Sequence, residues 1–425
     1  MKEILLVFYS EGMYDQAAYA LRDYCNRNAR DFEVVLAEEN RYTNFKLAKL
    51  RLGFYKVTAR SLPLLNRFSG NIRQKERWFK RDERRKASKE TNSDDNADTS
   101  ESSRAFKAQF YCVDNVLMRF RPAAVLCLTP KSHKRVLNAR QRLQMNMPVY
   151  AMMTDYCLNR NFLQEDTDGY LVQNKILAQA LQNKDIPSEK IEIVGTPVES
   201  AKLTQYDRAE TRAEFGIAND LPIITMMAGR YGGDVLKHCF EIMSGYCDRL
   251  NLVVMTVGSV SLVNYITNIC KSKSIQDNVL LIDRVQDIAK VYSVTDVLLT
   301  APTAAITYEA QARRIPFVVL GAMNAIEKGN LDYLTSYGVA RRACTPDEIV
   351  SSVLNLLNNP DYYRLQIERL GEFTSDACEK TTRYLHDKMY EYRQQNPDEE
   401  GAFEPMTAYA QSDDATRQDS DEQGD

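Results

Sequence analysis

The sequence predicts an α/β protein made of two doubly wound domains, and three observations lead to this prediction. The chain has 425 residues, which is too many for a single hydrophobic core. Short apolar segments alternate with segments of helix length, the pattern typical of parallel sheets covered by helices on both faces. This pattern occurs twice, on either side of a polar stretch at residues 196–222. We therefore expect two domains of similar, Rossmann-like architecture.

The first domain, residues 1–200, should contain six strands. Most of them are apolar at nearly every position, as expected for strands buried on both faces. The expected strands are residues 3–8, 32–37, 123–128, 148–153, 169–173 and 191–195. The opening segment, MKEILLVFYSEG, is too short and too acidic for a secretory signal, so we interpret it as the first strand.

A basic segment interrupts this domain. Residues 41–90 contain 16 Lys or Arg and four acidic residues, interleaved with apolar and aromatic ones. A helix of this composition fits an anionic membrane surface, and also a helix packed on its own domain with a solvated basic face. Nucleic acid is a third interpretation, which nothing else in the sequence supports. We expect a membrane contact through residues 41–80 and no nucleic-acid partner. Residues 81–104 hold no apolar residue larger than Ala, which predicts a disordered loop.

The second domain, residues 201–358, should contain five further strands. They are residues 222–229, 251–258, 278–283, 296–300 and 316–321. Residues 359–395 read as C-terminal helices. The tail at residues 396–425 is acidic and rich in Pro, Ser and Gln, which predicts disorder.

Composition excludes several classes of protein. The nine cysteines form no CxxC pair, which is typical of buried reduced thiols in a cytoplasmic protein. Three histidines make a His-rich metal site improbable. No apolar run approaches the roughly 20 residues that span a bilayer. The net charge of −3 does not indicate a polyanionic partner for the whole chain.

Three strand-to-helix turns in the second domain are candidates for binding phosphate. The first contains Gly229 and Gly232, the second contains Gly258, and the third runs through Thr303 and Ala304 without glycine. Backbone N–H groups at a helix start bind phosphate, and glycine allows a close approach. Tight turns also need glycine for purely local reasons, so this alternative stays open.

The order of these segments resembles the GT-B glycosyltransferases that make glycolipids. The similarity is to processive diacylglycerol glucosyltransferases and monogalactosyldiacylglycerol synthases, and more distantly to the peptidoglycan N-acetylglucosaminyltransferase. It is carried by PVYAMMTDY, DGYLVQNKILAQALQNKDIPSEKIEIVGTPVES, TRAEFGIANDLPIITMMAGRYGG and RVQDIAKVYSVTDVLLTAPTAAITYEAQARRIPFVVL, and more faintly by residues 1–24. The resemblance implies a GT-B fold in which two Rossmann-like domains face a central cleft.

The resemblance also implies a UDP-sugar site on the second domain. The turn at Thr303 and Ala304 would present helix N–H groups to the diphosphate, and Glu309 would hold the ribose hydroxyls. The residues alone also allow Glu309 to be a surface partner of Arg313, four positions later. The full implied site is Gly229, Arg230, Gly232, Gly258, Val285, Thr303, Ala304, Glu309, Glu327 and Asn330.

Several residues depart from the family pattern. Ala301-Pro302-Thr303-Ala304 replaces Lys-Pro-Gly-Gly, so the Thr303 side chain could cap the helix, and Arg230 could neutralise phosphate in place of the lysine. Gly12-Met13-Tyr14-Asp15 replaces Gly-Gly-Gly-His, and Thr129-Pro130 replaces His-Pro. Ile326 stands where the family has glutamine beside the retained Glu327 and Asn330.

Asp15 is therefore the candidate general base, and Gly12 and Asp155 should lie on the acceptor side. No carboxylate pair of the DxD type follows a donor-domain strand, so we expect no metal and no cofactor beyond the UDP-sugar donor.

These observations predict an inverting glycosyltransferase that moves a hexose or N-acetylhexosamine from a UDP-sugar to a diacylglycerol-like or polyprenyl-linked acceptor. Such an enzyme would be cytoplasmic and peripheral on the inner face of the cell membrane. A catalytically silent relative that binds a nucleotide-sugar or a partner as a sensor or scaffold is the first alternative. A UDP-sugar 2-epimerase is the second, and the scarcity of histidine disfavours it.

Overall fold

The computed structural model describes residues 3–10, 14–29, 32–39, 113–227, 233–256, 258–283, 287–322, 324–370 and 376–396. The basic segment 41–80, the loop 81–104 and the tail beyond residue 396 lie outside the described residues. The predicted site residues Gly12, Gly229, Arg230, Gly232 and Val285 lie outside them as well.

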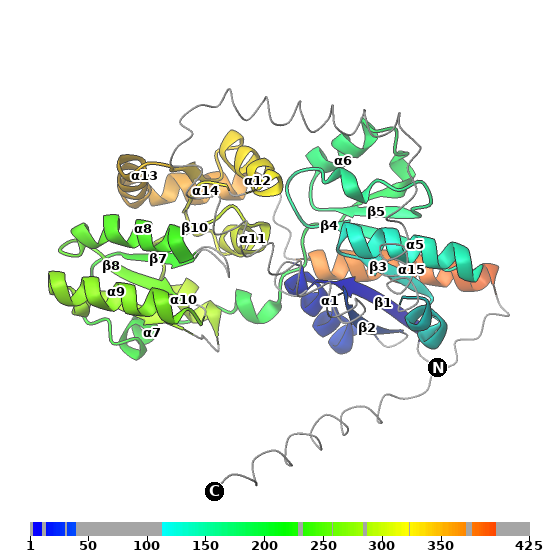
Figure 1. Ribbon diagram of the computed structural model, residues 1–425, viewed down its shortest axis with the longest axis horizontal. Coiled ribbons are helices and arrows are strands. Elements are labelled where there is room, and N and C mark those ends of the chain that lie inside the picture. Colours follow the sequence, from blue (N-terminus) through cyan, green and yellow to red (C-terminus); the bar gives the residue numbers. More distant parts are fainter. Residues whose placement is uncertain are drawn as a thin grey trace, which may run out of the picture.

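Two parallel sheets, each of six strands within the described part of the chain, form the two lobes seen in Figure 1. The N-terminal sheet has the order β2-β1-β3-β4-β5-β6. Its strands are β1 Glu3–Tyr9, β2 Phe32–Glu38, β3 Ala124–Cys127, β4 Val149–Met153, β5 Gly169–Val172 and β6 Ile191–Ile193.

The second sheet has the order β12-β11-β10-β7-β8-β9. Its strands are β7 Ile223–Met227, β8 Asn251–Met255, β9 Val279–Ile282, β10 Val297–Thr300, β11 Phe317–Val319 and β12 Arg341–Arg342. Every neighbouring pair in both sheets is parallel. The predicted α/β class is confirmed, and a strand forms at each of the expected positions. The short edge strand β12 was not expected, because two exposed arginines carry no strand pattern.

Helices cover both faces of the sheets. In chain order they are α1 Asp15–Asn28, α5 Pro130–Leu143, α6 Lys175–Gln182, α7 Arg208–Glu214, α8 Gly233–Met243, α9 Val260–Lys273, α10 Ile288–Val294, α11 Ala304–Ala312, α12 Ala325–Ser336, α13 Pro346–Asn358, α14 Pro360–Leu370 and α15 Ala377–Gln395. Short 3₁₀ turns are η2 Arg160–Phe162, η3 Ser188–Lys190, η4 Ser200–Leu203, η5 Ser244–Tyr246 and η6 Gln276–Asn278.

Local signals explain where several helices begin. Thr129 accepts a hydrogen bond from the Ser132 N–H at the start of α5, and Asn174 accepts one from the Leu177 N–H at the start of α6. At the start of α13, Thr345 and Glu348 form a capping box. Such caps satisfy N–H groups that the first helical turn leaves without partners.

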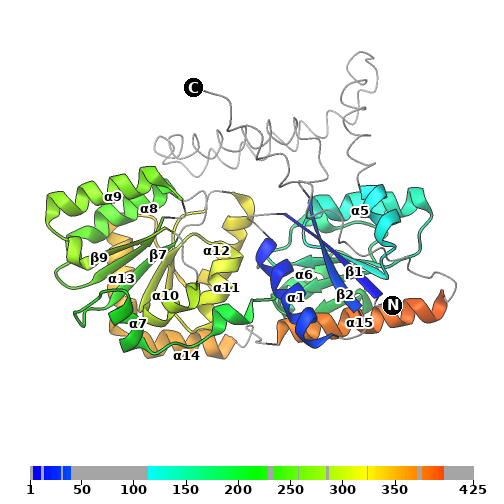
Figure 2. The same ribbon diagram turned by 90° about the horizontal axis from the view of Figure 1, so that it is seen from below.

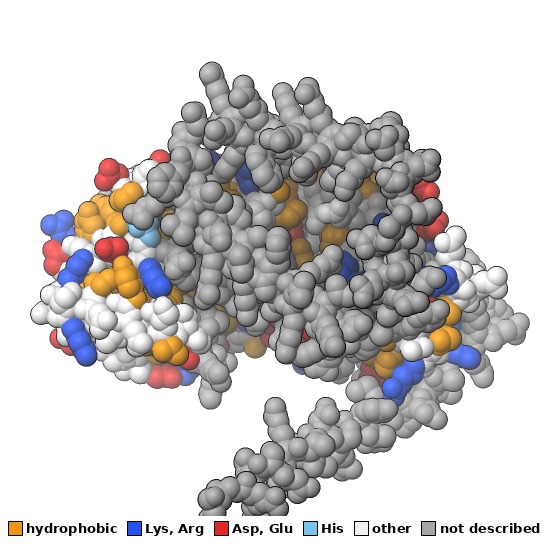
Figure 3. All heavy atoms as spheres, viewed as in Figure 1, with side chains coloured by type: hydrophobic (Ala, Val, Ile, Leu, Met, Phe, Trp, Pro, Cys, Tyr) orange, Lys and Arg blue, Asp and Glu red, His pale blue; other side chains and the backbone are white. Residues whose placement is uncertain are grey.

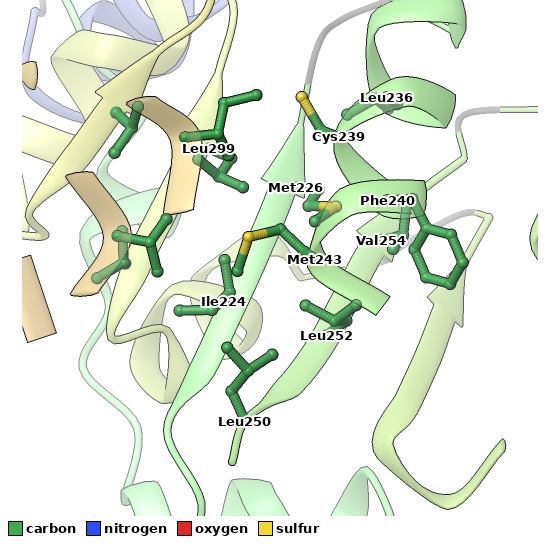
Figure 4. Packing of buried hydrophobic residues seen from close by; sticks show 14 of the residues in the cluster. Ile224, Met226, Leu236, Cys239, Phe240, Met243, Leu250, Leu252, Val254 and Leu299 are labelled. Carbon is green, nitrogen blue, oxygen red and sulfur yellow. The ribbon is translucent and has the colours of Figure 1, made fainter. Parts of the chain in front are cut away.

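One hydrophobic core of the second domain lies between α8 and its sheet. Phe240 and Met243 of α8 pack against Ile224, Leu252 and Val254 of β7 and β8 (Figure 4). All five side chains are at most 1% exposed. Burial of each such side chain contributes about 1.5–3 kcal/mol to the stability of the fold. This gain explains why the sequences of these strands are continuously apolar.

The last helix, α15, returns to the N-terminal domain and lies along it in both Figures 1 and 2. Leu385 and Met389 are at most 2% exposed within the N-terminal core. Arg393 donates from Nε and Nη2 to the two carboxylate oxygens of Glu3, each at 2.7 Å. The helices predicted at residues 359–395 therefore form, and α15 closes the fold on the first strand.

The strand order indicates where a ligand would bind in the second domain. In the second sheet, the chain runs outward from β7 through β8 and β9, then returns to β10 on the other side of β7. Ligands of open α/β sheets bind beyond the carboxyl ends of the strands at such a reversal. The turn after β10 starts at this reversal of strand order. The chain also leaves β7 there, and residues 228–232 after β7 lie outside the described ranges.

Candidate functional site

The two domains meet where Asp155 contacts Asn330. Asp155 follows β4 of the N-terminal domain, and Asn330 lies on α12, which follows β11 of the second domain. The Asn330 Nδ2 donates to Asp155 Oδ1 at 3.0 Å. Figures 1 and 2 both show α11 and α12 on the side of their domain that faces the N-terminal domain. Two residues predicted for opposite sides of the site, the acceptor and the donor sides, are thus in direct contact.

Asn330 also holds two further segments. Its Nδ2 donates to the carbonyl of Pro302 at 3.2 Å, in the turn after β10. Its Oδ1 accepts from the Tyr156 N–H at 2.9 Å. The side chain joins α12, the turn after β10 and the loop after β4, and Asn330 is only 1% exposed.

Tyr156 inserts into the second domain beside this contact. Its ring stacks between those of Tyr308 on α11 and Tyr333 on α12, with ring centroids 5.1 and 4.9 Å away. Its hydroxyl lies 3.0 Å from Thr307 Oγ1 and accepts a hydrogen bond from Gln311 Nε2. Stacked aromatic pairs contribute roughly 0.5–1.5 kcal/mol beyond the area they bury, so this loop is firmly held by α11 and α12.

Burial governs the electrostatics of Asp155. Removal from water raises the pKa of this carboxyl group, and hydrogen bonds from Asn330 and Tyr14 act in the opposite direction. The Tyr14 hydroxyl donates to Asp155 Oδ2 at 3.2 Å. Burial and the neighbouring carboxylate also raise the pKa of Tyr14. Both groups are therefore held as a hydrogen-bonded pair at the start of α1.

The turn after β10 leads into α11 at Thr303. The first helical bond runs from the Thr307 N–H to the Thr303 carbonyl at 3.2 Å, so the N–H groups of the residues just before Thr307 start the helix without helical acceptors. The prediction that the Thr303 side chain caps this helix is wrong, since Thr303 makes no side-chain cap. Its hydroxyl is buried and has no hydrogen-bond partner among the described residues. Ala304, the first residue of α11, is buried.

Glu309 is buried on α11 and has two partners. Lys202 Nζ of η4 donates to Oε1 at 2.9 Å, and the Tyr292 hydroxyl donates to Oε2 at 2.6 Å. Burial opposes the Lys202 charge, but Glu309 and Glu199 outweigh this effect and raise the Lys202 pKa. Arg313, the alternative partner, instead donates to the carbonyls of Lys202 and Thr204. Glu309 is therefore no surface residue, and its contact with ribose stays a prediction.

The remaining predicted residues lie around this centre. Asp15 is the first residue of α1, is half-buried and accepts from the Gln16 N–H at 3.1 Å. Glu327 is half-buried in the first turn of α12. Gly258 has a φ of 75°, a conformation that favours glycine, and its N–H donates to Asp283 Oδ1 at 2.5 Å. The sugar and phosphate contacts of these residues stay predictions.

Three tyrosines and one lysine take part in these hydrogen-bond networks but were not predicted as site residues. They are Tyr14, Tyr156, Lys202 and Tyr292. Tyr156 belongs to the Thr-Asp-aromatic sequence already noted, which is the one signal that could have indicated it. Lys202 is 107 positions from Glu309, and no local pattern relates residues at that distance.

The described residues offer neither a metal site nor a membrane-spanning helix. Within the described ranges, no group of three or more His, Cys, Asp or Glu side chains could hold a metal ion. None of the helices that the structure describes is long and apolar enough to cross a bilayer.

Comparisons with known proteins agree with the resemblance. The monogalactosyldiacylglycerol (MGDG) synthase family model matches residues 14–198. The processive diacylglycerol beta-glucosyltransferase of Staphylococcus saprophyticus is 26% identical over 249 residues, which are 58% of this chain and 62% of that protein. The match thus spans less than two thirds of this relative. The predicted similarity to this group of proteins is confirmed.

Solved structures confirm the predicted GT-B fold. MurG of Acinetobacter baumannii aligns with a TM-score of 0.58 at 12% identity, over 91% of this chain and all of that one. The UDP-GlcNAc 2-epimerase of Neisseria meningitidis, bound to UDP-GlcNAc, aligns with the same TM-score at 14% identity, again over 91% and 100% of the two chains. Identities this low concern the fold alone.

Proposed function

We propose that this protein is an inverting glycosyltransferase that moves a hexose or N-acetylhexosamine from a UDP-sugar to a lipid acceptor. Diacylglycerol is the first acceptor to test, because the similar protein of S. saprophyticus is named as a diacylglycerol glucosyltransferase. The observation that carries the proposal is the contact between Asp155 and Asn330. It brings the predicted acceptor side and donor side to one point at the carboxyl ends of both sheets.

The donor would occupy the crevice of the second domain. The N-terminus of α11 favours a diphosphate, because its first N–H groups and the helix dipole attract negative charge. Glu309 would bind the ribose only after exchanging a bond from Lys202 or Tyr292 for the sugar hydroxyls. Glu327 would face the donor sugar, and Asn330 would lie beneath it.

Asp15 would act as the general base. It would take the proton of the acceptor hydroxyl as that oxygen attacks the anomeric carbon, while the bond from this carbon to the UDP oxygen breaks. The leaving UDP would keep the electron pair and stay near the start of α11. A single displacement of this kind inverts the anomeric configuration and needs no covalent intermediate.

A lipid acceptor requires the protein to reach a membrane. We assign this contact to residues 41–80, as a peripheral protein on the inner face of the cell membrane. The assignment depends on composition, since this segment lies outside the described residues.

UDP binding is the first test. UDP at about 100 times its Kd should stabilise the protein by about 2.7 kcal/mol, measured as a rise in melting temperature. Replacing Glu309→Gln should weaken UDP binding by roughly 1–3 kcal/mol, because a charged hydrogen bond to ribose is lost. The matched control is Glu368→Gln, a half-exposed carboxylate that pairs with Arg314 on the outer surface. Equal UDP affinity in wild type and Glu309→Gln would refute the ribose assignment.

Turnover is the second test. The protein should release UDP from UDP-glucose or another UDP-hexose only when a dispersed diacylglycerol is present. UDP release without acceptor, together with epimerised sugar, would instead identify an epimerase.

A catalytically silent relative is the second candidate, and one observation favours it. Both oxygens of Glu309 already have partners within the protein, and its side chain is only 4% exposed. Such a protein would bind UDP or a UDP-sugar and stabilise on binding, yet release no UDP with any acceptor.

A further inference from the structure

We propose that Asn330 is a positioning residue that connects the donor turn after β10 to the N-terminal domain, and that it acts through Pro302 and Asp155 without touching the donor sugar. The proposal rests on the proposed function, because that function places the UDP diphosphate at the turn after β10. It assigns Asn330 a different task from the donor contact that the family resemblance implies.

The hydrogen-bonding capacity of the amide supports this role. An Asn side chain has two N–H donors and one oxygen acceptor. In Asn330, the donors go to Asp155 Oδ1 and to the Pro302 carbonyl, and the oxygen accepts from the Tyr156 N–H. Both donors are used within the protein, and the residue is 1% exposed. No N–H remains for a sugar hydroxyl unless one of these bonds breaks.

The packing around Gly329 is a second, independent observation. A Cβ at this position would lie 2.7 Å from the Cys157 Cβ and closer still to its Sγ. The helix α12 therefore approaches the loop after β4 so closely that only glycine fits without a shift. Together with Tyr156 between two rings of α11 and α12, this contact holds Asn330 at a fixed distance from Asp155.

The consequence concerns the turn that starts α11. Pro302 directly precedes Thr303, so the bond from Asn330 sets where the first N–H groups of α11 lie relative to Asp155. A displacement of about 1 Å at a reacting centre can lower the rate about 100-fold. Loss of the amide should therefore lower kcat more than it raises the KM for the UDP-sugar.

Replacing Asn330→Asp tests the idea through pH. The new carboxylate would face Asp155, and two adjacent carboxylates in a buried site share one proton until the pH rises enough to remove it. The shared proton can replace the bond between the two side chains, and its loss leaves two repelling charges. Two other titratable groups at the contact are Tyr14 and Cys157, whose pKa values burial raises, for Cys157 to about 11. Glu39 acts on Tyr14 and Asp332 acts on Cys157 through their negative charges, which raise these pKa values further. Between about pH 6 and 8.5, only the carboxylate pair should change charge.

The expected result is a variant whose kcat falls about 10- to 100-fold below wild type at about pH 8.5 and recovers part of the difference at about pH 6, because the shared proton restores the bond to Asp155 but not the bond to the Pro302 carbonyl. The control is Asn268→Asp, the same change at an exposed position of α9, which should keep the wild-type pH profile. A wild-type profile for Asn330→Asp would overturn the proposal. So would a KM for the UDP-sugar that is raised equally at all pH values with kcat unchanged, the result expected of a sugar ligand.

Hydrogen exchange of the full-length protein gives a readout that needs no turnover. Asn330→Ala should speed amide exchange in both residues 154–157 and residues 301–305, because one side chain joins the two segments. Exchange that changes in one segment only, or in neither, would contradict the connection. If the wild type neither binds UDP nor turns over, the proposed function fails, and this exchange experiment still decides the role of Asn330.

Discussion

His133 shows what complete burial does to a titratable side chain. This residue of α5 is 0% exposed, and its Nε2 lies 3.1 Å from Thr167 Oγ1. Burial lowers the His133 pKa from 6.5 to about 4, because the charged imidazolium loses its hydration. A histidine whose folded pKa is depressed supports the fold above its unfolded pKa and weakens it as the pH falls.

This shift predicts an acid-dependent loss of stability. As the pH falls from about 6.5 to about 4, the titration of His133 should lower the free energy of unfolding by about 3 kcal/mol. Replacing His133→Gln keeps a group that can bond to Thr167 and removes the titration. Urea denaturation at several pH values should show that the stability difference between wild type and variant shifts by about this amount over that range. A pH-independent difference would mean that the imidazole is protonated without penalty in the folded protein.

The surroundings of Glu309 could be predicted from the sequence only in part. The sequence correctly placed this residue on a helix after a buried strand, but its partners come from η4 and α10. The Thr303 cap failed for a related reason. The local sequence favours a capping hydroxyl, whereas the hydroxyl in the folded protein is buried away from the helix N–H groups.

At the scale of elements, helix α12 packs tightly against the loop after β4. Gly329 leaves no room for a side chain beside Cys157. The cost of adding a methylene to a tightly packed contact is roughly 1–3 kcal/mol. The helix and the loop should therefore be sensitive to one added carbon.

Replacing Gly329→Ala should destabilise the protein by about that amount, measured by denaturant unfolding. Cys157→Gly in the same chain removes both clashing atoms and should recover much of the loss, so the double variant should be more stable than the sum of the single changes predicts. Gly245→Ala is the matched control, because an added Cβ there meets nothing within 4 Å. Additive effects of Gly329→Ala and Cys157→Gly would contradict this contact.

At the scale of the whole molecule, α15 makes the N-terminal domain depend on the end of the described chain. Ending the protein after Asp376 removes Leu385 and Met389 from the core, and each buried side chain contributes about 1.5–3 kcal/mol. The loss of several kcal/mol should leave the N-terminal domain largely unfolded, as measured by circular dichroism. Ending the protein after Asn396 keeps α15 and should change little. Equal stability of the two truncated proteins would show that α15 is dispensable.

The surface charge of the whole molecule concerns the membrane. Figure 3 shows Lys, Arg, Asp and Glu side chains interspersed on the described part of one face. The concentrated positive charge is at residues 41–80, outside the described residues. We therefore assign the electrostatic membrane contact to this segment.

Replacing Lys46, Lys49, Arg51 and Lys56 with Gln should cost up to about 4 kcal/mol of binding to anionic vesicles, at about 1 kcal/mol per cation. Wild-type binding should weaken as salt rises, since the Debye length is about 8 Å at physiological ionic strength. The control replaces four exposed cations of the described domains, Lys184, Arg249, Lys271 and Lys328, and should bind almost as wild type does. Equal binding to neutral and anionic vesicles would reject the electrostatic contact.

The sheets could be predicted from the sequence, because strand formation here depends on short apolar runs that each lie within a few consecutive residues. The two-domain plan and the similarity to known glycolipid enzymes could be predicted as well, since they depend on the order of motifs along the chain. The partners of the candidate site residues could not be predicted in this way. Asp155 and Asn330 are 175 positions apart, and Lys202 and Glu309 are 107 apart. Hydrogen bonds and burial between such residues arise when the two sheets face each other, so no local pattern in the chain encodes them.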